Sequence, residues 1–296
     1  MIAEWMQTFV AVAEAGSFSA AATGQGVTQS TVSKQVAALE SHLEARLFQR
    51  TTRSLALTEE GQRFYDAAKQ ALAAIDEAKA RISAAPQAKG LVRVTCPQSL
   101  AERKVAAMVK QFLDCHPGIA VELVISDRAL NLVSDNLDMA IRVGQLVDSQ
   151  LIARRIGVAR RMLAASPEYL ARAGVPVIPA DLKDHDCVLF SLLGAGNEWR
   201  FTGGRSVRVN GRLRANCPST LRAAALAGAD IVQSARWLFE DDLATGRLLP
   251  VLPDFEPEPM PIHAVLPSGH HISARTRIFL DFLAECFAQD PLCRPD

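Results

Sequence analysis

The chain has 296 residues, of which 49% are hydrophobic and 22% charged, so it is long enough for about two ordinary domains with buried cores. Lys plus Arg and Asp plus Glu both number 32, which excludes a polybasic, histone-like protein but not a local basic surface. No segment approaches the ~18 uninterrupted apolar residues of a membrane span, and the first residues lack the basic and apolar regions of a secretion signal. We therefore expect a cytoplasmic protein with no membrane partner.

The sequence contains no motif typical of catalysis or of cofactor binding. It has no P-loop, no His-Glu-X-X-His and no Gly-X-Ser-X-Gly, and its six cysteines include no Cys-X-X-Cys pair. The adjacent His270 and His271 are more typical of a loop than of a metal site. We expect inert thiols, no metal, no cofactor and no enzymatic activity.

Short helices are predicted for the first sixty residues. Apolar residues recur at helical spacing from Met6 to Ala13, stop at Gly16 and resume at Phe18. Thr28 is a good N-cap for a third helix, in which Val32 and Val36 begin a narrow apolar stripe. The opposite face can approach base edges or can be an ordinary solvated surface. Its candidate base-contacting residues are Gln29, Ser30, Ser33 and Lys34.

A small β-wing is predicted after this helix, because residues 54–57 alternate and follow a Thr-rich turn. Arg50 and Arg53 are spaced to straddle a phosphate backbone or to enter a minor groove. Residues 31–57 carry only a small excess of positive charge, so we expect moderate, salt-dependent affinity for DNA.

A long helix is predicted from Thr58 to about Ala84, with Glu59 and Glu60 at the positive end of its dipole. Apolar residues repeat along it at alternating spacings of four and three, which indicates packing on a partner helix. The partner is a second copy of the chain or, alternatively, the chain's own C-terminal domain. The seam consists of Phe64, Ala68, Ala71, Ile75, Ala78 and Ile82.

After Gly90 the pattern changes to strands that alternate with helices. Residues 91–96, 121–125 and 137–143 are predicted strands, and residues 97–113 are a predicted helix. This order is typical of βαβ units and a mainly parallel sheet. About 200 residues of it predict two α/β lobes.

The N-terminal segments resemble the LysR-type transcriptional regulators. Residues 9–22 look like that family's first two helices, residues 27–36 like its recognition helix, and residues 47–53 and 57–61 like its wing and linker-helix start. Residues 137–144, 199–201, 211–216 and 242–250 resemble its effector domain. The wing, Arg50-Thr51-Thr52-Arg53, is most similar to the branch that carries the same four residues.

The resemblance implies an all-α winged helix-turn-helix domain (1–60), a linker and dimerisation helix (58–86) and an α/β two-lobed effector domain (91–296) like that of periplasmic binding proteins. We place lobe 1 at 91–164 and 265–296 and lobe 2 at 165–264, with crossings near Ala164–Ala165 and Ala264–Val265. The phosphate backbone or the minor groove of DNA would be held by the wing residues Arg50, Thr51, Thr52 and Arg53. Implied partners are double-stranded DNA with an interrupted palindrome, further copies of the chain in a homodimer or homotetramer, and RNA polymerase.

A small-molecule effector is implied between the lobes, at strand C-termini. Free N–H groups at the start of a helix would suit a carboxylate. Few cations converge there apart from Arg142, so we expect a small acid, with aromatic acids included, rather than a polyanion. The same residues are otherwise ordinary turn residues. The candidate effector-binding residues are Pro97, Gln98, Ser99, Leu100, Val143, Gly144, Asn216 and Cys217.

Some positions depart from the family pattern or suggest other functions. Gln25 replaces a buried leucine, and Gln233-Ser234 replace Leu-Pro. Asp230, in place of glycine, is either a helix-end feature or a charge that repels an anionic effector. Cys96 and Cys217 near the cleft suggest a thiol redox sensor as an alternative, and a solute-binding or enzymatic α/β protein is a further one.

Overall fold

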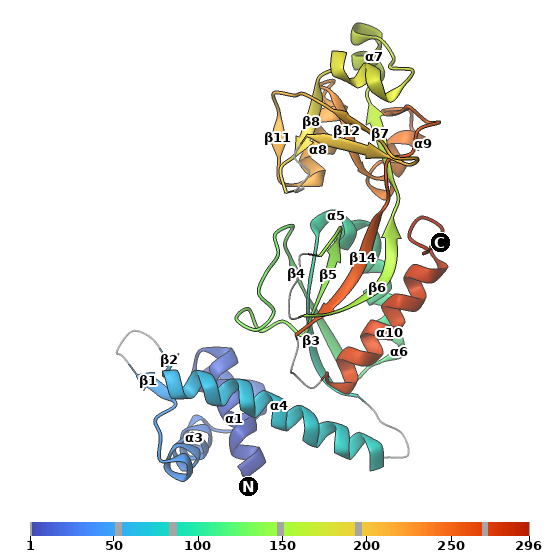
Figure 1. The fold of residues 1–296 in the computed structure, drawn as a ribbon. Coiled ribbons are helices and arrows are strands. Elements are labelled where there is room, and N and C mark those ends of the chain that lie inside the picture. Colours follow the sequence, from blue (N-terminus) through green and yellow to red (C-terminus); the bar gives the residue numbers. More distant parts are fainter. Residues whose placement is uncertain are drawn as a thin grey trace. The chain divides into compact units, whose positions relative to one another are not determined.

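The computed structural model describes residues 2–50, 55–82, 88–146, 151–192, 197–267 and 272–295, with the backbone alone for residues 50, 73 and 76–82. These residues form two compact units. The first holds the N-terminal helices and the wing, and the second holds the two large sheets with their helices (Figure 1). No described helix is both long enough and apolar enough to cross a membrane.

The first unit is a helical bundle with a two-stranded wing. Its core is formed by buried side chains from all the helices, among them Phe9, Val36, Leu39 and Tyr65. The all-α winged helix-turn-helix fold predicted for residues 1–60 is confirmed. Its elements are α1 (Ile2–Ala15), α2 (Phe18–Gln25), α3 (Gln29–Leu43), β1 (Phe48–Arg50), β2 (Leu55–Leu57) and α4 (Glu59–Ile82).

Local signals in the sequence set the ends of these helices. Ser17 caps α2 by accepting a hydrogen bond from the Ala20 N–H, and Thr28 caps α3 by accepting one from the Thr31 N–H, each at 3.3 Å. Gly26 ends α2 in the left-handed conformation, with φ of 66°. The turn between α2 and α3 is therefore fixed by residues on both of its sides.

Lobe 1 of the second unit is a five-stranded sheet in the order β4-β3-β5-β14-β6. The helix predicted for 97–113 begins at Gln98 and continues to Cys115, but it contains a π-helical turn, η1, over Ala101–Val105. The elements of lobe 1 are β3 (Gly90–Cys96), α5 (Gln98–Leu100), α6 (Ala106–Cys115), β4 (Ile119–Ile125), β5 (Met139–Val143), β6 (Ile152–Ala159), β14 (Met260–Leu266) and α10 (Ala274–Gln289).

Lobe 2 is a second five-stranded sheet, in the order β11-β8-β12-β7-β13. A separate hairpin, β9 (Glu198–Phe201) and β10 (Arg205–Arg208), buries Trp199 and Phe201 in the core of this lobe. The remaining elements are β7 (Arg161–Ala165), α7 (Pro167–Ala173), η2 (Pro179–Asp184), β8 (Cys187–Phe190), β11 (Arg214–Ala215), α8 (Pro218–Leu226), β12 (Ile231–Ala235), η3 (Arg236–Leu238), α9 (Glu240–Ala244) and β13 (Leu249–Val251).

Both sheets are mixed, so the prediction of a mainly parallel sheet was wrong. β3 is parallel to β4 and β5, but β14 is antiparallel to β5 and β6. In lobe 2, β12 is parallel to β8 and antiparallel to β7. The antiparallel pairs arise because β6, β7 and β14 carry the chain between the lobes, a connection that a βαβ pattern does not reveal.

The chain crosses between the lobes earlier than the sequence suggested. β6 ends at Ala159 in one sheet and β7 begins at Arg161 in the other, so Ala164 and Ala165 lie inside lobe 2. The return crossing precedes Met260, since β14 belongs to lobe 1 (Figure 1). The extended run 152–165 is interrupted only at Arg160, so its apolar pattern did not mark the change of sheet.

Candidate functional site

The outer face of α3 presents the side chains that sequence reasoning assigned to bases. Gln29, Ser30 and Lys34 are exposed and Ser33 is half-buried, while Val32 and Val36 on the inner face are fully buried. The Ser30 hydroxyl lies 2.9 Å from the Thr28 hydroxyl at the cap. A polar face with one cation is thus held away from the core, as a base-reading helix requires.

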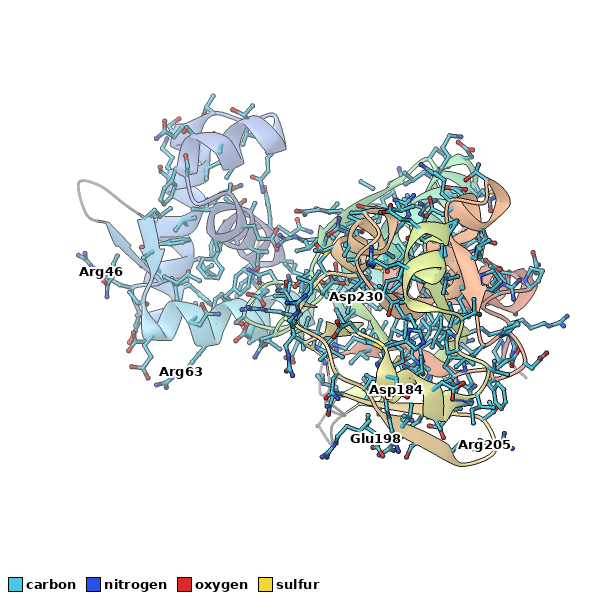
Figure 2. All side chains as sticks on the ribbon, turned by 90° about the horizontal axis from the view of Figure 1, so that it is seen from above. Arg46, Arg63, Asp184, Glu198, Arg205 and Asp230 are labelled. Carbon is cyan, nitrogen blue, oxygen red and sulfur yellow. The ribbon has the colours of Figure 1, made fainter. Side chains whose placement is uncertain are left out.

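The wing is fixed to α3 by a half-buried carboxylate. Glu40 Oε1 accepts hydrogen bonds from the N–H groups of Leu47 at 2.7 Å and Phe48 at 3.2 Å. Arg46, which leads into β1, projects outward from the unit (Figure 2). Arg50 contributes backbone to β1, whereas its side chain and the residues Thr51, Thr52 and Arg53 lie outside the described residues.

Gln25 is accommodated by polar partners rather than by the apolar core. It is exposed, and its Oε1 lies 3.5 Å from the buried Thr8 hydroxyl, which also lies 2.7 Å from Gln35 Oε1. Gln35 Nε2 in turn donates to Glu4 Oε1 at 3.0 Å. The departure from leucine therefore belongs to a polar network that joins α1, α2 and α3.

The predicted seam of α4 begins inside the first unit. Phe64 packs on Phe9, with ring centroids 5.5 Å apart, and Ala68 is 1% exposed. Ala71 and Ile75 are half-buried, and the side chains of Ala78 and Ile82 lie outside the described residues. The first turns of α4 thus stabilise the chain's own bundle.

A cavity of about 110 Å³ lies between the two lobes of the second unit. Pro97, Ser99, Leu100 and Val143, four of the residues proposed for the effector, line it. Sequence reasoning missed the other lining residues, which come mostly from lobe 2. They are Asp127, Ala159, Arg161, Phe190, Pro218, Leu221, Gln233, Ser234, Ala235, Trp237 and Met260.

The other proposed effector residues do not line this cavity. The Cys217 thiol donates to Gln98 Oε1 at 3.3 Å, so these two side chains contact each other across the lobes. The Gly144 N–H donates to the Pro261 carbonyl at 2.9 Å, and Asn216 is exposed. These residues lie beside the cleft rather than on its inner surface.

The cation of the cleft is Arg161, not Arg142. Val143 lines the cavity, and successive side chains of a strand point to opposite faces, so Arg142 faces away and donates to the Leu130 carbonyl at 2.9 Å. Arg161 is the first residue of β7, at the crossing that sequence reasoning misplaced. Burial lowers the pKa of its guanidinium to about 10, so it stays protonated at neutral pH.

The helix start in the cleft already holds a carboxylate of the chain itself. Asp127 Oδ1 accepts a hydrogen bond from the Gln98 N–H at 3.2 Å. Burial raises the pKa of Asp127, the Gln98 hydrogen bond opposes this shift, and the nearby Glu102 adds to it. Asp127 would therefore compete with an effector carboxylate for the N–H groups at Pro97–Leu100.

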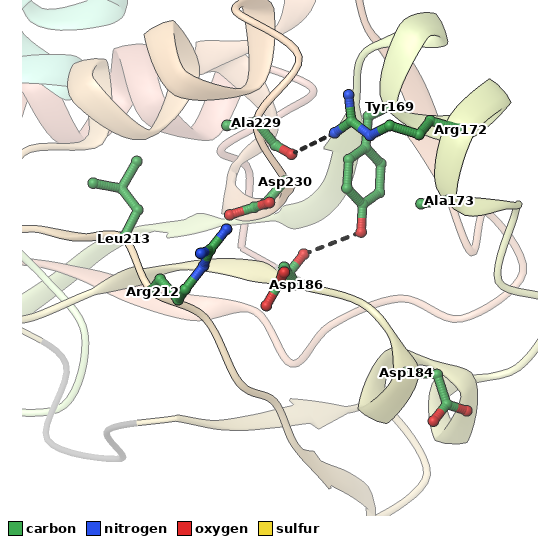
Figure 3. Close-up of a pocket in the computed structure, with 9 residues that line it drawn as sticks. All are labelled: Tyr169, Arg172, Ala173, Asp184, Asp186, Arg212, Leu213, Ala229 and Asp230. Atoms are coloured by element: carbon green, nitrogen blue, oxygen red, sulfur yellow. Dashed lines mark hydrogen bonds between the residues drawn. The ribbon is translucent and has the colours of Figure 1, made fainter.

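A second, more open groove lies in lobe 2 and contains Asp230. Figure 3 shows Asp230, Asp186 and Arg212 directed toward one another, with Arg172 beside Tyr169. Burial and the like charge of Asp186 raise the pKa of Asp230, and Arg212 and Arg172 oppose that shift. Asp230 is not among the residues that line the cleft between the lobes.

The environment of the Cys96 thiol does not activate it. Cys96 is fully buried, and burial raises the pKa of its thiol well above the usual range, with the charge of Asp127 adding to the effect. All six cysteines are free. A reactive thiolate requires a depressed pKa, so Cys96 does not fit a redox role.

Comparison with known proteins agrees with this geometry. The family model described as bacterial regulatory helix-turn-helix protein, lysR family, matches residues 3–62, and the LysR substrate binding domain matches residues 85–288. The HTH-type regulator YhjC of Escherichia coli K12 is 36% identical over 94% of this chain and 95% of its own length. CrgA of Neisseria meningitidis serogroup C is 35% identical over 95% of this chain and 96% of its own length.

A solved structure matches this chain over nearly its full length. The structure of CrgA, a LysR-type transcriptional regulator from Neisseria meningitidis, has a TM-score of 0.61 and 34% identity, and the match covers 95% of this chain and 97% of that one. A winged helix-turn-helix unit joined to two mixed-sheet lobes around a cavity defines a DNA-binding regulator with an effector-binding domain. The chain belongs to the LysR-type transcriptional regulator family, which is not enzymatic.

Proposed function

We propose that this regulator reads an interrupted palindromic DNA site through α3 and the wing, and that a small organic acid in the cleft controls its activity. The observation that carries the effector class is the cavity with Arg161 among apolar side chains. A half-buried cation in a small, mostly apolar cavity favours a small anion with an apolar body over a polyanion.

The division of the chain supports this mechanism. We assign DNA binding to 1–60, self-association into a homodimer or homotetramer to the helix over 58–86, and effector binding to 91–296. RNA polymerase is a further partner in this proposal, and the cell compartment is the cytoplasm. The wing sequence at residues 50–53 supports the branch with Arg-Thr-Thr-Arg.

Base reading by α3 is tested by footprinting and gel retardation on the DNA upstream of the protein's own gene, at a stated salt concentration. A protected site with two-fold symmetry is expected. Lys34→Ala should relax discrimination against a single base pair by roughly 1–3 kcal/mol, because Lys34 is the exposed cation of the face.

Arg53→Ala provides the matched comparison, since a phosphate contact affects all sequences alike. It should weaken binding uniformly and reduce the salt dependence. Equal loss on all sequences for Lys34→Ala would remove that residue from base reading. Absence of a protected site would overturn the assignment of α3 as a whole.

A further inference from the structure

Two residues that line the cleft carry buried hydrogen-bond donors with no acceptor among the described residues. The donors are Gln233 Nε2 and Trp237 Nε1, and the two residues are 7% and 1% exposed. An unsatisfied buried donor is costly, so such groups in a cavity wall indicate where a ligand places acceptors. The only other buried unpartnered side-chain atom among those residues, His263 Nδ1, does not line the cleft.

The orientation of the Gln233 amide is fixed by Arg161. Arg161 Nη1 donates to Gln233 Oε1 at 2.9 Å, and Arg161 Nε donates to the Glu258 carbonyl at 2.8 Å. A flipped amide would set an NH₂ group against the guanidinium, so the oxygen must face Arg161 and the NH₂ group must face elsewhere. The free donor of Gln233 is therefore a consequence of the network.

Arg161 itself has no carboxylate within ion-pair distance in the described part of the chain. Its two hydrogen-bond acceptors are a carbonyl and an amide oxygen, both of them neutral. A cation removed from solvent is stabilised by a counter-charge, and here the charge of Glu258 only partly offsets the burial of Arg161. The lobe 2 wall thus carries the positive charge of Arg161 and the two buried donors of Gln233 and Trp237 around one cavity.

The lobe 1 wall has the opposite character. Asp127 occupies the first N–H of the helix at Gln98 and adds a negative charge to the cavity. An anionic group placed on that side would meet like charge, whereas one placed on the lobe 2 side would meet donors. The remaining surface is largely apolar and includes Leu100, Phe190, Leu221 and Met260.

We propose that Arg161, Gln233 and Trp237 form the subsite for the carboxylate of the effector, and that Asp127 selects monocarboxylates by excluding a second anionic group. This inference deepens the proposed function and rests on it. The acid end lies against lobe 2, and the apolar body lies between Leu100, Phe190 and Met260. Gln233, which departs from the family pattern, is then a specificity-determining residue.

The subsite is tested on the full chain labelled with ¹⁵N in its tryptophans. The three indole N–H signals are those of Trp5, Trp199 and Trp237, and Trp237→Phe identifies the third. Benzoate and acetate should shift the Trp237 signal downfield in a saturable manner, because a carboxylate oxygen accepts from that N–H. Benzamide and terephthalate should bind about tenfold more weakly than benzoate or not at all.

Gln233→Glu is the decisive variant because it should fold. The new carboxylate would pair with Arg161 and neutralise the subsite, so benzoate affinity should fall at least about tenfold while the melting temperature is kept. Arg154→Gln is the matched control, since Arg154 pairs with Asp281 outside the cleft. It should leave benzoate binding unchanged.

Three results would overturn the subsite: benzamide binding as tightly as benzoate, a Trp237 signal unmoved by any of the monocarboxylates, or benzoate binding by the Gln233→Glu protein equal to that of wild type. The same preparations are assayed for DNA retardation. Loss of the carboxylate effect with intact, sequence-selective DNA binding would refute the subsite alone. Failure of DNA binding would instead refute the proposed function.

Discussion

Gly61 lies in the first turn of α4, against the backbone of Leu47. A Cβ at this position would lie 2.0 Å from the Leu47 carbonyl oxygen. The Thr58 N–H donates to the same carbonyl at 3.0 Å, and the Thr58 hydroxyl donates to the Arg46 carbonyl at 2.6 Å. Gly61 is therefore required for the close approach between the start of α4 and the segment that leads into the wing.

Gly61→Ala should destabilise the first unit by roughly 1–3 kcal/mol, the range for forcing an extra methyl group into a packed site. Urea unfolding followed by circular dichroism measures the loss. Gly24→Ala is the control, because no atom lies within 4 Å of a Cβ there and alanine favours a helix. Equal stability of the Gly61→Ala protein and wild type would contradict the assigned contact.

Buried acids of lobe 2 predict a loss of stability at alkaline pH. Burial and the charges of Asp230 and Asp186 raise the pKa of the Cys187 thiol to about 12, and burial raises that of Tyr169 to about 12. In the unfolded chain the thiol has its ordinary pKa of about 9, so it loses its proton at lower pH than in the folded protein. The stability that the buried neutral thiol contributes is therefore complete below pH 9 and is lost as pH rises toward 12.

Urea unfolding between pH 8 and 10.5 measures this dependence. The free energy of unfolding of the second unit should fall as pH rises, and Cys187→Ala should make the fall less steep, whatever its effect at pH 8. An identical slope in the two proteins would show that Cys187 does not contribute.

At the scale of elements, helices were predictable and the path of the strands was not. The 3.6-residue period of Val32, Val36 and Leu39 and the cap at Thr28 determine α3 locally. The π-helical turn at Ala101–Val105 and the switch of sheet at Arg160 depend on tertiary packing. Neither changes the local pattern of apolar and polar residues, so neither could be seen in it.

Helices α8 and α9 are joined by a buried ion pair. Asp242 is fully buried and accepts hydrogen bonds from Arg222 at Oδ2 (2.5 Å) and at Oδ1 (2.8 Å), and Arg247 Nη2 lies 2.7 Å from the same Oδ1. The adjacent Asp241 is largely exposed and pairs with Arg103 of η1. The ion pairs of Asp242 are thus buried at the carboxylate, whereas the ion pair of the neighbouring Asp241 is largely exposed.

Asp242→Asn should destabilise lobe 2 by about 3 kcal/mol, the lower end for removing one partner of a buried pair, because Arg247 is 56% exposed. Asp241→Asn should change stability little, since an exposed pair is screened by solvent. Thermal unfolding of the two variants gives the comparison. A similar cost for both substitutions would refute the role given to burial.

For the whole molecule, the cleft was predicted where its residues follow a strand and missed where they lie at a crossing. Pro97, Ser99 and Leu100 follow β3, at the strand end where α/β sheets bind ligands. Arg161 and Gln233 reach the same cavity only because the chain changes sheet at Arg160. The predicted crossing at Ala164–Ala165 left Arg161 in lobe 1 and so hid the cation.

The same distinction between local and tertiary packing applies to self-association through α4. The seam was predicted from spacing alone, but its first positions are used by the chain itself, since Phe64 packs on Phe9 and Ala68 is buried. Tyr65 adds a hydrogen bond to Glu14 at 3.0 Å, which fixes this part of α4 to α1. A partner helix would therefore contact the positions from Ala71 onward.

Two substitutions along one face of α4 separate these roles. Ile75→Asp should disrupt the dimer while the first unit keeps its helical content, because it places a charge on the seam beyond the bundle. Ala68→Asp should instead unfold the first unit, because the new charge would be buried in its core. Sedimentation velocity measures the assembly, and circular dichroism measures the fold. An unchanged sedimentation coefficient for a folded Ile75→Asp protein would refute the seam as the interface between copies of the chain. A folded Ala68→Asp protein would refute the division of α4 into a part that packs inside the first unit and a part that packs on a partner helix.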